Sequence, residues 1–433
     1  MADPNKTNPV SRTMRMLHKV LLVIIIFMAG WIANTTLRKY QMNLRQNTEA
    51  AQGSTVPRYS HSSQVASFSL TVVSDVVLWT SKGKGEIPVY RVPVLTYTPQ
   101  GNLVAIAEGR RESEKDVNPK IFAVKRSVDG GATWSPPQRI VDDGNRARFK
   151  FSSYIGTIFV DDTTATIFLM YVFCEFCPTR SLMLINSTDD GITWGRPRNI
   201  TDHVGKDYAT HPSPGYGIQK KQEPAEGRLI VCGHGFHDGK GLVLLLSDDH
   251  GVTWRRGAFV PSVPFMPQRE MGHFDPDECQ PVELPDGSIY IVARNQKRYK
   301  CHCKVIMRSF DGGETLPRKY MFLDNSLVEP KITSGVWYHN GTMFYSGPQS
   351  QTKRANLYIR WSHDYGHTWT PGTQIWGDLS GYSTLTMLPH DIKHLYILYE
   401  RGTNQYFDEI AVTKMKISAA KGRNSEMRNG NSP

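Results

Sequence analysis

Arginines and carboxylates stand in short motifs along the chain whose residue types suit the binding of an acidic molecule. In Tyr90-Arg91-Val92-Pro93, an arginine lies between an aromatic residue and a proline. Those neighbours restrain it, as a fixed bidentate carboxylate binder would have to be restrained. Further motifs centred on Arg, Asp, Glu or Tyr follow in this order: Glu108 and Arg110, Asp116, Glu278, Arg294, Arg354, Tyr382 and Glu400. Taken singly, such residues are more often ion pairs at the rim or edge aromatics, so it is their joint order that is informative.

An internal repeat predicts the secondary-structure elements that must position these residues. Five copies of S-x-D-x-G-x-T-W, or nearly so, begin 60, 60, 62 and 53 residues apart, at Ser127, Ser187, Ser247, Ser309 and Ser362. In each copy we expect the Asp to accept hydrogen bonds from its own turn and the Gly to supply a positive φ. The Thr should begin a new strand and the Trp should pack under the turn. The five aspartates are therefore interpreted as structural: Asp129, Asp189, Asp249, Asp311 and Asp364.

Between the copies run short apolar or alternating stretches that are typical of β-strands. Examples are residues 166–171, 228–232, 289–293 and 395–399, each bounded by Gly, Pro or Asp. A period near 60 leaves room for four short strands per repeat, and residues 76–415 hold about six such units. Radial packing of such units leaves only short sheet edges. We therefore predict an all-β, six-bladed β-propeller spanning residues 70–417.

The composition narrows the classes of function. The chain has 433 residues, of which 39% are hydrophobic, enough for a globular core. A net charge of +11 suits an anionic partner, although arginines in a pocket and scattered lysines contribute to it equally. No helix-rich basic region or pattern of stacking aromatics points to nucleic acid.

The N-terminal residues predict entry into the secretory pathway. A basic segment, residues 1–19, precedes an unbroken apolar run of fourteen residues, 20–33. That length fits a signal-peptide core better than a membrane span of about 20 residues. The candidate cleavage sites are poor, because Phe27 before Ala29 and Trp31 before Ala33 put a bulky side chain where a small one is expected. A cleaved signal and a retained type II membrane anchor therefore both stay open. Residues 34–69 read as a polar linker or stalk, and residues 418–433 as a disordered tail.

Delivery to an oxidising lumen gives meaning to the sequons and the cysteines. Four N-glycosylation sequons follow the apolar run, at Asn34, Asn186, Asn199 and Asn340. Among the six cysteines, disulfides are the default, and Cys174-x-x-Cys177 could close a local loop. Cys301-His302-Cys303 admits a zinc site as the lesser alternative, since a second ligand pair is missing. The pairing of the other cysteines stays open.

Taken together, the repeats and the ordered motifs resemble the sialidase (neuraminidase) superfamily, and most of all its animal lysosomal type. The repeats resemble the Asp boxes of that superfamily, and residues 217–220, 227–235, 246–251 and 276–281 look close to the lysosomal type. The similarity covers about residues 77–417. It implies a six-bladed propeller with the active site at its axial mouth.

By this resemblance, three arginines hold the carboxylate of the substrate: Arg91, Arg294 and Arg354. Arg360 competes for the third position, but its spacing to the last Asp box favours Arg354. Glu400 matches the residue that supports the first arginine. Arg110 matches an arginine that lines the pocket, where it either touches the substrate or orders the loop carrying Asp116.

The resemblance further implies that Tyr382 is the nucleophile, that Glu278 is the base that deprotonates it, and that Asp116 is the acid on a mobile loop. A neutral phenol avoids repulsion by the carboxylate on the anomeric carbon of sialic acid. A tyrosine has an ordinary pKa of about 10, so it needs a partner that accepts its proton. Neither a metal ion nor a cofactor is expected to take part.

We therefore expect a retaining exo-α-sialidase that acts on terminal sialic acids of glycoproteins, oligosaccharides or glycolipids, with an acid pH optimum. The resemblance also implies a complex with a protective serine carboxypeptidase and a β-galactosidase. The tail lacks the tyrosine-based sorting signal of the lysosomal type, so lysosomal delivery and membrane anchoring both stay open. One alternative is a sialic-acid-binding propeller without turnover; a weaker one is a transglycosylating relative.

Overall fold

The structure, a computed structural model, describes residues 68–82, 87–144, 152–176, 179–205, 209–236, 240–262 and 274–419. The predicted segments 1–19 and 20–33, the sequon at Asn34 and Cys177 lie outside these residues, as do all but two residues each of segments 34–69 and 418–433. In the part of the chain that the structure describes, no helix has the length and apolar character that a membrane span requires.

The described residues form an all-β unit with strands in five sheets. The first sheet has the order β2–β3–β4–β5: Val89–Tyr97, Leu103–Arg110, Lys120–Ser127 and Gln138–Asp142. The second has the order β11–β6–β7–β8–β9: Gly215–Tyr216, Ser152–Asp161, Thr166–Phe176, Thr179–Ser187 and Arg198–Asn199. Only β11 pairs in parallel, with β6. The expected strand at residues 166–171 is thus confirmed.

The other three expected strands, at residues 228–232, 289–293 and 395–399, are confirmed in the remaining three sheets. The third contains β10 (Ala209–Pro212), β12 (Ile218–Gln219), β13 (Leu229–Phe236), β14 (Lys240–Ser247) and β15 (Arg255–Pro261). The fourth contains β16 (Pro276–Glu283), β17 (Ile289–Asn295), β18 (Cys303–Ser309) and β19 (Phe322–Val328). A short helix α2 (Thr201–Val204) and a 3₁₀ turn η1 (Arg318–Tyr320) lie between strands.

The fifth sheet has seven strands and joins the beginning of the described chain to its end. Its order is β1–β25–β24–β23–β22–β21–β20: Phe68–Thr80, Glu409–Ala419, Asp391–Gly402, Thr373–Leu388, Ala355–Ser362, Thr342–Pro348 and Gly335–His339. The outer strand β1 pairs with β25 from Phe68 opposite Ala419 to Thr80 opposite Glu409.

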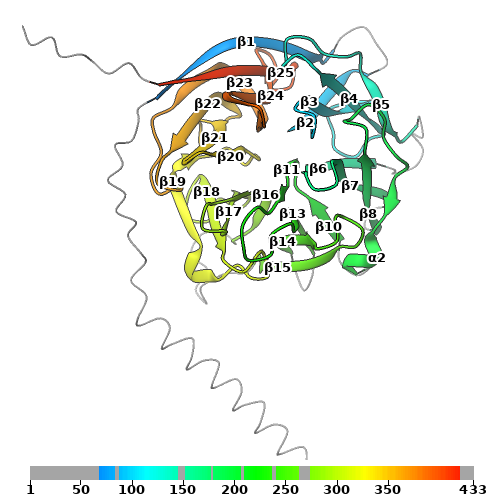
Figure 1. The fold of residues 1–433 in the computed structure, drawn as a ribbon. Helices are drawn as coiled ribbons and strands as arrows, with labels where there is room; N and C mark the ends of the chain where they lie inside the picture. Colours follow the sequence, from blue (N-terminus) through cyan, green and yellow to red (C-terminus); the bar gives the residue numbers. More distant parts are fainter. Residues whose placement is uncertain are drawn as a thin grey trace, which may run out of the picture. The chain divides into compact units, whose positions relative to one another are not determined.

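The sheets stand around a common centre, so the predicted propeller-like arrangement is confirmed (Figure 1). Strands of successive sheets touch: β2 contacts β6, β6 contacts β13, β13 contacts β16 and β16 contacts β20. The ring closes where β2 contacts β23 and β24.

Apolar side chains pack between the sheets. Strand β7 shows how, because Ile167, Leu169 and Tyr171 belong to one buried cluster, whereas Phe168 and Met170 belong to another. Successive side chains of a strand point to opposite faces, so a strand covered on both faces is a continuous apolar run. Each such side chain contributes about 1.5–3 kcal/mol relative to an exposed one.

The five Asp boxes have one geometry, which confirms their structural reading. In each, the Asp accepts a backbone hydrogen bond of 2.8–3.0 Å from the Thr four residues later. The Gly of each turn has φ between 81° and 93°. The expectation that the Thr begins a strand was wrong: its hydroxyl instead donates to the same Asp, and β5, for example, begins only at Gln138.

Two disulfides are described, and one of them rules out the zinc alternative. Cys301 bonds to Cys303, so these two residues offer no thiolates to a metal ion. Cys232 on β13 bonds to Cys279 on β16 and so ties the third sheet to the fourth. Cys174 is also disulfide-bonded.

Candidate active site

A continuous set of contacts joins most of the predicted site residues where strands of three sheets meet. Tyr382 on β23 is central, and its hydroxyl donates to Glu278 Oε1 on β16 at 2.5 Å. The other oxygen, Glu278 Oε2, accepts from Arg294 Nη1 on β17 at 2.7 Å. Arg294 Nη1 also lies 3.3 Å from the Tyr382 hydroxyl. The structure thus brings these three residues together on buried strands.

The surroundings of Tyr382 keep its hydroxyl protonated. Burial raises its pKa, and the Glu278 carboxylate raises it further, whereas Arg294 and Arg354 act in the opposite direction. The net effect is a pKa well above the ordinary value for tyrosine. A phenol held in this way can lose its proton only to a base already in contact with it, and Glu278 is in that position.

Glu400 on β24 holds both Tyr382 and Arg91 in place. Its Oε1 accepts from Arg91 Nε at 2.7 Å and from the Val92 amide at 2.8 Å. Its Oε2 accepts from the Tyr382 amide at 3.0 Å. The carboxylate is fully buried, so these three donors supply what water would otherwise provide. Burial lowers the pKa of Arg91, but Glu400 outweighs it and the net pKa is raised, so this arginine stays charged.

The backbone around Arg91 is bent to make these contacts. The pairing of β2 with β3 is interrupted between Arg91 and Val94, and Val92 has φ 54°. A positive φ is costly for a β-branched residue, and such conformations persist where the surroundings determine them. Here the Val92 amide is turned toward Glu400. The restraint that the sequence indicated for Arg91 is therefore present, and it involves a carboxylate from a distant strand.

Gly381 leaves the space that Glu400 fills. A Cβ at this position would lie 1.9 Å from Glu400 Oε2 and 2.9 Å from Tyr406 Cδ2. Because Glu400 is fixed by three hydrogen bonds, we expect Gly381→Ala to lower the free energy of unfolding by about 1–3 kcal/mol. Urea denaturation measures the change. Gly377→Ala on the same strand is the matched control, since its Cβ meets only the flexible end of Gln374 at 3.3 Å; equal losses in both variants would contradict the prediction.

Arg354 lies over the aromatic side chains of the site. Its guanidinium carbon is 5.4 Å from the Tyr382 ring centroid and 4.9 Å from that of Tyr406. The competing candidate, Arg360, binds elsewhere and donates to the backbone carbonyls of Ser326, Trp369 and Thr370. The structure thus places Arg354, and not Arg360, beside Tyr382.

Tyr406 is a member of the site that the sequence did not single out. Its ring faces Arg91 as well as Arg354, with 4.9 Å between the ring centroid and the guanidinium carbon in each case. A ring with a negative face can keep two like charges close together. The only signal was its place shortly after the Tyr399-Glu400-Arg401-Gly402 motif.

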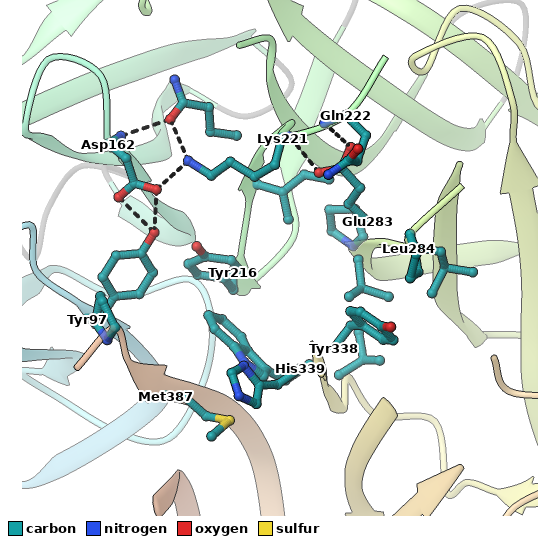
Figure 2. Close-up of a pocket in the computed structure, with 18 of the residues that line it drawn as sticks. Tyr97, Asp162, Tyr216, Lys221, Gln222, Glu283, Leu284, Tyr338, His339 and Met387 are labelled. Atoms are coloured by element: carbon teal, nitrogen blue, oxygen red, sulfur yellow. Dashed lines mark hydrogen bonds and ion pairs between the residues drawn. The ribbon is translucent and has the colours of Figure 1, made fainter. Parts of the chain in front are cut away.

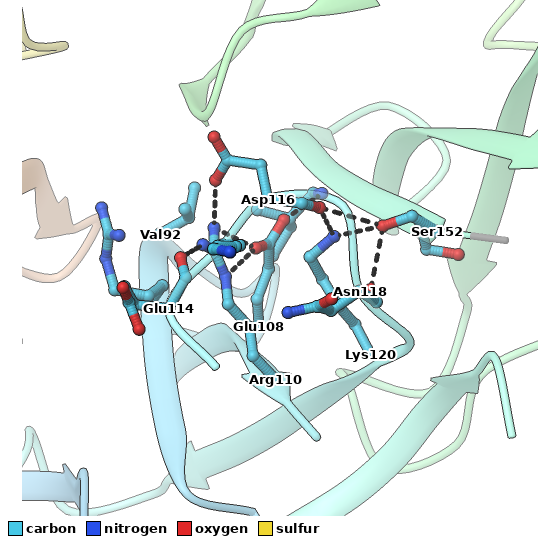
Figure 3. Close-up of polar contacts among 12 residues, drawn as sticks. Val92, Glu108, Arg110, Glu114, Asp116, Asn118, Lys120 and Ser152 are labelled. Atoms are coloured by element: carbon cyan, nitrogen blue, oxygen red, sulfur yellow. Dashed lines mark hydrogen bonds and ion pairs between the residues drawn. The ribbon is translucent and has the colours of Figure 1, made fainter. Parts of the chain in front are cut away.

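Arg110 orders the loop that carries Asp116. From the end of β3, the buried guanidinium pairs with Glu108 at 2.8 Å and with Asp116 at 2.8 Å (Figure 3). It also donates to the backbone carbonyl of Glu114. Glu108 is fixed in turn, because its other oxygen accepts from the Ile155 amide at 2.9 Å. Of the two roles considered for Arg110, these contacts show the ordering of the loop.

Lys120 supports the same loop and was missed by the sequence analysis. Its fully buried ammonium group donates to the Asp116 carbonyl and to the Ser152 hydroxyl, both at 2.5 Å (Figure 3). It also lies 4.2 Å from the centroid of the Tyr154 ring. Burial lowers the pKa of Lys120. A lysine opening the apolar run 120–124 was the available signal.

Asp116 differs from the other carboxylates of the site because its side chain is 73% exposed. The partial burial of its carboxylate raises its pKa, but Arg110, with smaller contributions from Arg91 and Lys120, lowers it more. The net pKa is therefore below the ordinary value for aspartate. As it stands, Asp116 is an ionised, solvent-facing carboxylate at the edge of the arginine cluster.

The three predicted arginines have different partners. Arg91 pairs with Glu400 and Arg294 pairs with Glu278. Among the described residues, no carboxylate forms an ion pair with Arg354, whose guanidinium donates to the Lys331 carbonyl. A carboxylate entering between the three would add the missing negative charge, since guanidinium groups match its geometry.

Three of the four sequons lie in the described residues. Asn199 ends β9 and is exposed, and Asn340 is exposed at the turn between β20 and β21. Asn186 is half-buried within β8, and its carbonyl accepts from the Gly195 amide.

The chain is similar to proteins named sialidases. The sialidase of Micromonospora viridifaciens is 31% identical over 355 residues, which cover 74% of this chain and 51% of the relative. The sialidase of Bacteroides fragilis is 26% identical over 347 residues, covering 72% and 60%. Sialidase-2 of Cricetulus griseus is 24% identical over 305 residues, covering 63% and 73%. The chain thus spans about half to three fifths of the length of these bacterial relatives.

Solved structures show the same fold. A Hadza microbial sialidase, Hz136, has a TM-score of 0.64 and 23% identity, with 79% of this chain and 68% of that one covered. Trypanosoma rangeli sialidase has a TM-score of 0.63 and 18% identity, covering 79% and 59%. Residues 101–395 match the family model described as BNR repeat-like domain. The chain therefore belongs to the BNR repeat-like domain family, and sialidases of bacteria, fungi and animals are among its relatives.

Proposed function

We propose that the protein is a retaining exo-α-sialidase that removes terminal sialic acids from glycoproteins, oligosaccharides or glycolipids. The observation that carries this proposal is the contact of the Tyr382 hydroxyl with Glu278, 2.5 Å apart and flanked by Arg294 and Arg354. A buried tyrosine beside a base and under guanidinium groups suits a substrate whose reacting carbon carries a carboxylate. The similarity to sialidases supports the same conclusion.

In the first half of the proposed reaction, Arg91, Arg294 and Arg354 bind the substrate carboxylate. Glu278 takes the proton of the Tyr382 hydroxyl while the phenolic oxygen of Tyr382 bonds to the anomeric carbon. The bond from that carbon to the leaving oxygen breaks, and a proton from Asp116 neutralises the departing glycan. A tyrosine nucleophile is the recognised exception to the usual pair of carboxylates in glycosidases.

In the second half, Asp116 takes a proton from a water molecule, whose oxygen attacks the anomeric carbon. The bond to Tyr382 breaks and Glu278 returns the proton to the phenolate, so the enzyme is restored. Two displacements retain the configuration of the sugar. The carboxylates of Glu278 and Asp116 also stabilise the positive charge of the oxocarbenium-like transition states.

The proposal is tested with an aryl α-sialoside that releases a fluorescent phenol, at acidic and at neutral pH. We expect hydrolysis that is faster at acidic pH, with the α-anomer of sialic acid as the first product detected by NMR. A folded protein that binds sialic acid without releasing the phenol would instead support the binding-only alternative.

The ion pair between Arg110 and Asp116 predicts a specific pH effect. Asp116 must be protonated to act as an acid, so the rate should fall as the pH rises through its pKa. Arg110 lowers that pKa, so we expect Arg110→Gln to shift the alkaline limb of the pH–rate profile to higher pH. The ion pair also contributes to the stability of the fold. This contribution is fully present above the ordinary pKa of aspartate and is lost as the pH falls through the lowered pKa of Asp116. It is small, because Asp116 is exposed to solvent.

The matched control for this experiment is Arg111→Gln. Arg111 is the next residue and pairs with Asp142 at 2.8 Å, so the same charge is removed without touching Asp116. We expect the alkaline limb of this variant to stay where it is in the wild type. A limb that moves equally in both variants, or in neither, would assign the pH dependence to another group.

We also propose that the unit has six blades. Strand β23 pairs with β22 from Thr373 to Leu379 and with β24 from Leu379 to Leu388. The register shifts between Ser380 and Ser383, so the strand can be divided there between two blades. The seven-stranded sheet then makes two four-stranded blades, and the other four sheets make one each.

A third proposal is that the described unit matures in an oxidising lumen. Its disulfides support this, since such bonds persist in oxidising compartments. In protein from a secretory host, we expect N-glycans on the exposed Asn199 and Asn340 and none on the half-buried Asn186. Digestion with an N-glycosidase should therefore shift the wild type by more than Asn199→Gln or Asn340→Asp. Asn186→Gln should migrate like the wild type, and a shift in it would contradict the prediction.

A further inference from the structure

A pocket of about 550 Å³, shown in Figure 2, is lined by none of the residues of the candidate active site. Its volume is within the range of about 300–1,000 Å³ that is typical of small-molecule sites. Most of the residues that form it are apolar or aromatic, among them Tyr97, Tyr216, Val282, Trp337, Met387 and Ile392.

The pocket is at the opposite end of the inner strands from Tyr382. Arg91 is near the start of β2 and Tyr97 ends it, while Glu278 is near the start of β16 and Glu283 ends it. Tyr97 and Glu283, the last residues of these two strands, both line the pocket. With a rise of about 3.3 Å per residue, five or six residues separate the two regions by roughly 15–20 Å. The pocket is therefore distinct from the site where the arginines meet.

An aromatic wall forms one side of the pocket. The ring centroids of Tyr216 and Trp337 are 4.9 Å apart, and those of Tyr97 and Trp337 are 6.3 Å apart. Tyr97 and Tyr216 are 8% exposed, so their neighbours fix them, whereas Trp337 is half-buried. A rigid wall of this kind binds rings or chains at little cost in conformational entropy.

The charged groups around the pocket neutralise one another. Asp162 accepts from the Tyr97 hydroxyl at 2.9 Å and pairs with Lys221 at 2.5 Å (Figure 2). Glu283 pairs with the buried Lys220 at 2.7 Å and accepts from the Lys221 amide at 2.6 Å. Each carboxylate thus has its own ammonium group, and no uncompensated charge remains to attract an ion.

Two further residues that line the pocket are His339 and Ile392. His339 ends β20 and is half-buried, and this burial lowers its pKa, which favours the neutral imidazole. Ile392 is 52% exposed although it is a large aliphatic side chain. Because Ile392 lines a concave, largely apolar pocket, it adds apolar surface that a bound molecule would cover.

We propose that this pocket binds an uncharged, largely apolar small molecule, which packs against the wall of Tyr97, Tyr216 and Trp337 and is covered at the rim by Ile392. The neutralised charges exclude an ionic ligand, and the volume fits one drug-sized molecule. This site is independent of the proposed sialidase reaction.

The test uses N-phenyl-1-naphthylamine, an uncharged apolar probe whose fluorescence rises on burial, with the full chain. We expect saturable binding of one probe per chain and a Tm that increases with probe concentration, because a ligand of the folded state stabilises it. His339→Glu places a charge in the pocket, and Ile392→Asp places one at its rim. Each should weaken binding at least about tenfold, since an unpaired charge in an apolar site is costly.

The matched control is His367→Glu, the same change at an exposed histidine that does not line the pocket. It should bind the probe like the wild type. Hydrolysis of the aryl sialoside should be equal in all four proteins, so a failure of the proposed function leaves the binding result readable. Binding that does not saturate, or that is unchanged in both pocket variants, would overturn the proposal. Stoichiometry that falls as the protein concentration rises would also overturn it, because a second copy would then cover the pocket.

Discussion

Replacing Tyr382 by phenylalanine should reduce the hydrolysis of an aryl sialoside by about a thousandfold or more. The substitution removes the oxygen that bonds to the anomeric carbon, and effects of this order are typical when an enzyme loses its nucleophile. It also removes the hydrogen bond to Glu278, but the carboxylate keeps its contact with Arg294. The folded state should therefore persist, and the measurement is kcat/KM beside a thermal melt.

The control for Tyr382→Phe is Tyr399→Phe. Tyr399 is also buried, and its hydroxyl accepts from Arg401 at 3.2 Å and lies 3.4 Å from Asp75, so this variant likewise loses buried hydrogen bonds. We expect its kcat/KM to stay within a few-fold of the wild-type value. If Tyr382→Phe retained comparable activity, the assignment of the nucleophile would be wrong.

Replacing Glu400 by glutamine should destabilise the fold and the site together. The amide has the shape of the carboxylate, but its single oxygen cannot serve all three donors: Arg91 Nε, the Val92 amide and the Tyr382 amide. The buried charge of Arg91 is left unpaired, and such a loss costs about 3–5 kcal/mol. We expect a fall of that size in the free energy of unfolding and a kcat/KM lower by at least about a hundredfold.

Glu409→Gln is the matched control for Glu400→Gln. Glu409 pairs with Arg401 at 3.0 Å, but its side chain is 35% exposed, so water compensates for the loss of the charge. Ion pairs of this kind contribute about 0–1 kcal/mol. Urea denaturation of the two variants separates the cases. If Glu400→Gln were no less stable than Glu409→Gln, Glu400 would not hold Arg91 and Tyr382 as described.

The sequence predicted the strands well, because a strand and its bounding turns are encoded by residues that are close together in the chain. The Asp boxes gave the positions of the turns, since the Asp and Thr of each box bond to each other within four residues. The boundaries were less accurate: the Thr of each box closes the turn and does not start a strand. The sequence also did not show that the first half of β23 pairs with β22 and the second half with β24. That pairing depends on how distant strands pack and not on a local pattern.

The site was predicted in its members but not in their connections. The contact of Arg91 with Glu400 joins residues 309 apart, and that of Tyr382 with Glu278 joins residues 104 apart. Lys120 and Tyr406 were missed because a buried lysine and a loop tyrosine look ordinary until the fold places Asp116 and Arg91 beside them. The apolar pocket was missed for the same reason, since its walls come from the ends of strands in different sheets.

The pairing of β1 with β25 has a consequence for how the chain folds during synthesis. Phe68 and Ala419 are neighbours in the sheet but about 350 residues apart in the sequence, so β1 waits without its partner until nearly all of the chain has been made. Contacts of such long separation slow folding. Meanwhile β1 exposes an open edge that carries Val72 and Val73, and unpaired strand edges promote aggregation. Truncation within residues 409–419 removes the partner of β1 as well as part of β25, so it is expected to lower the yield of soluble protein far more than the loss of one strand suggests.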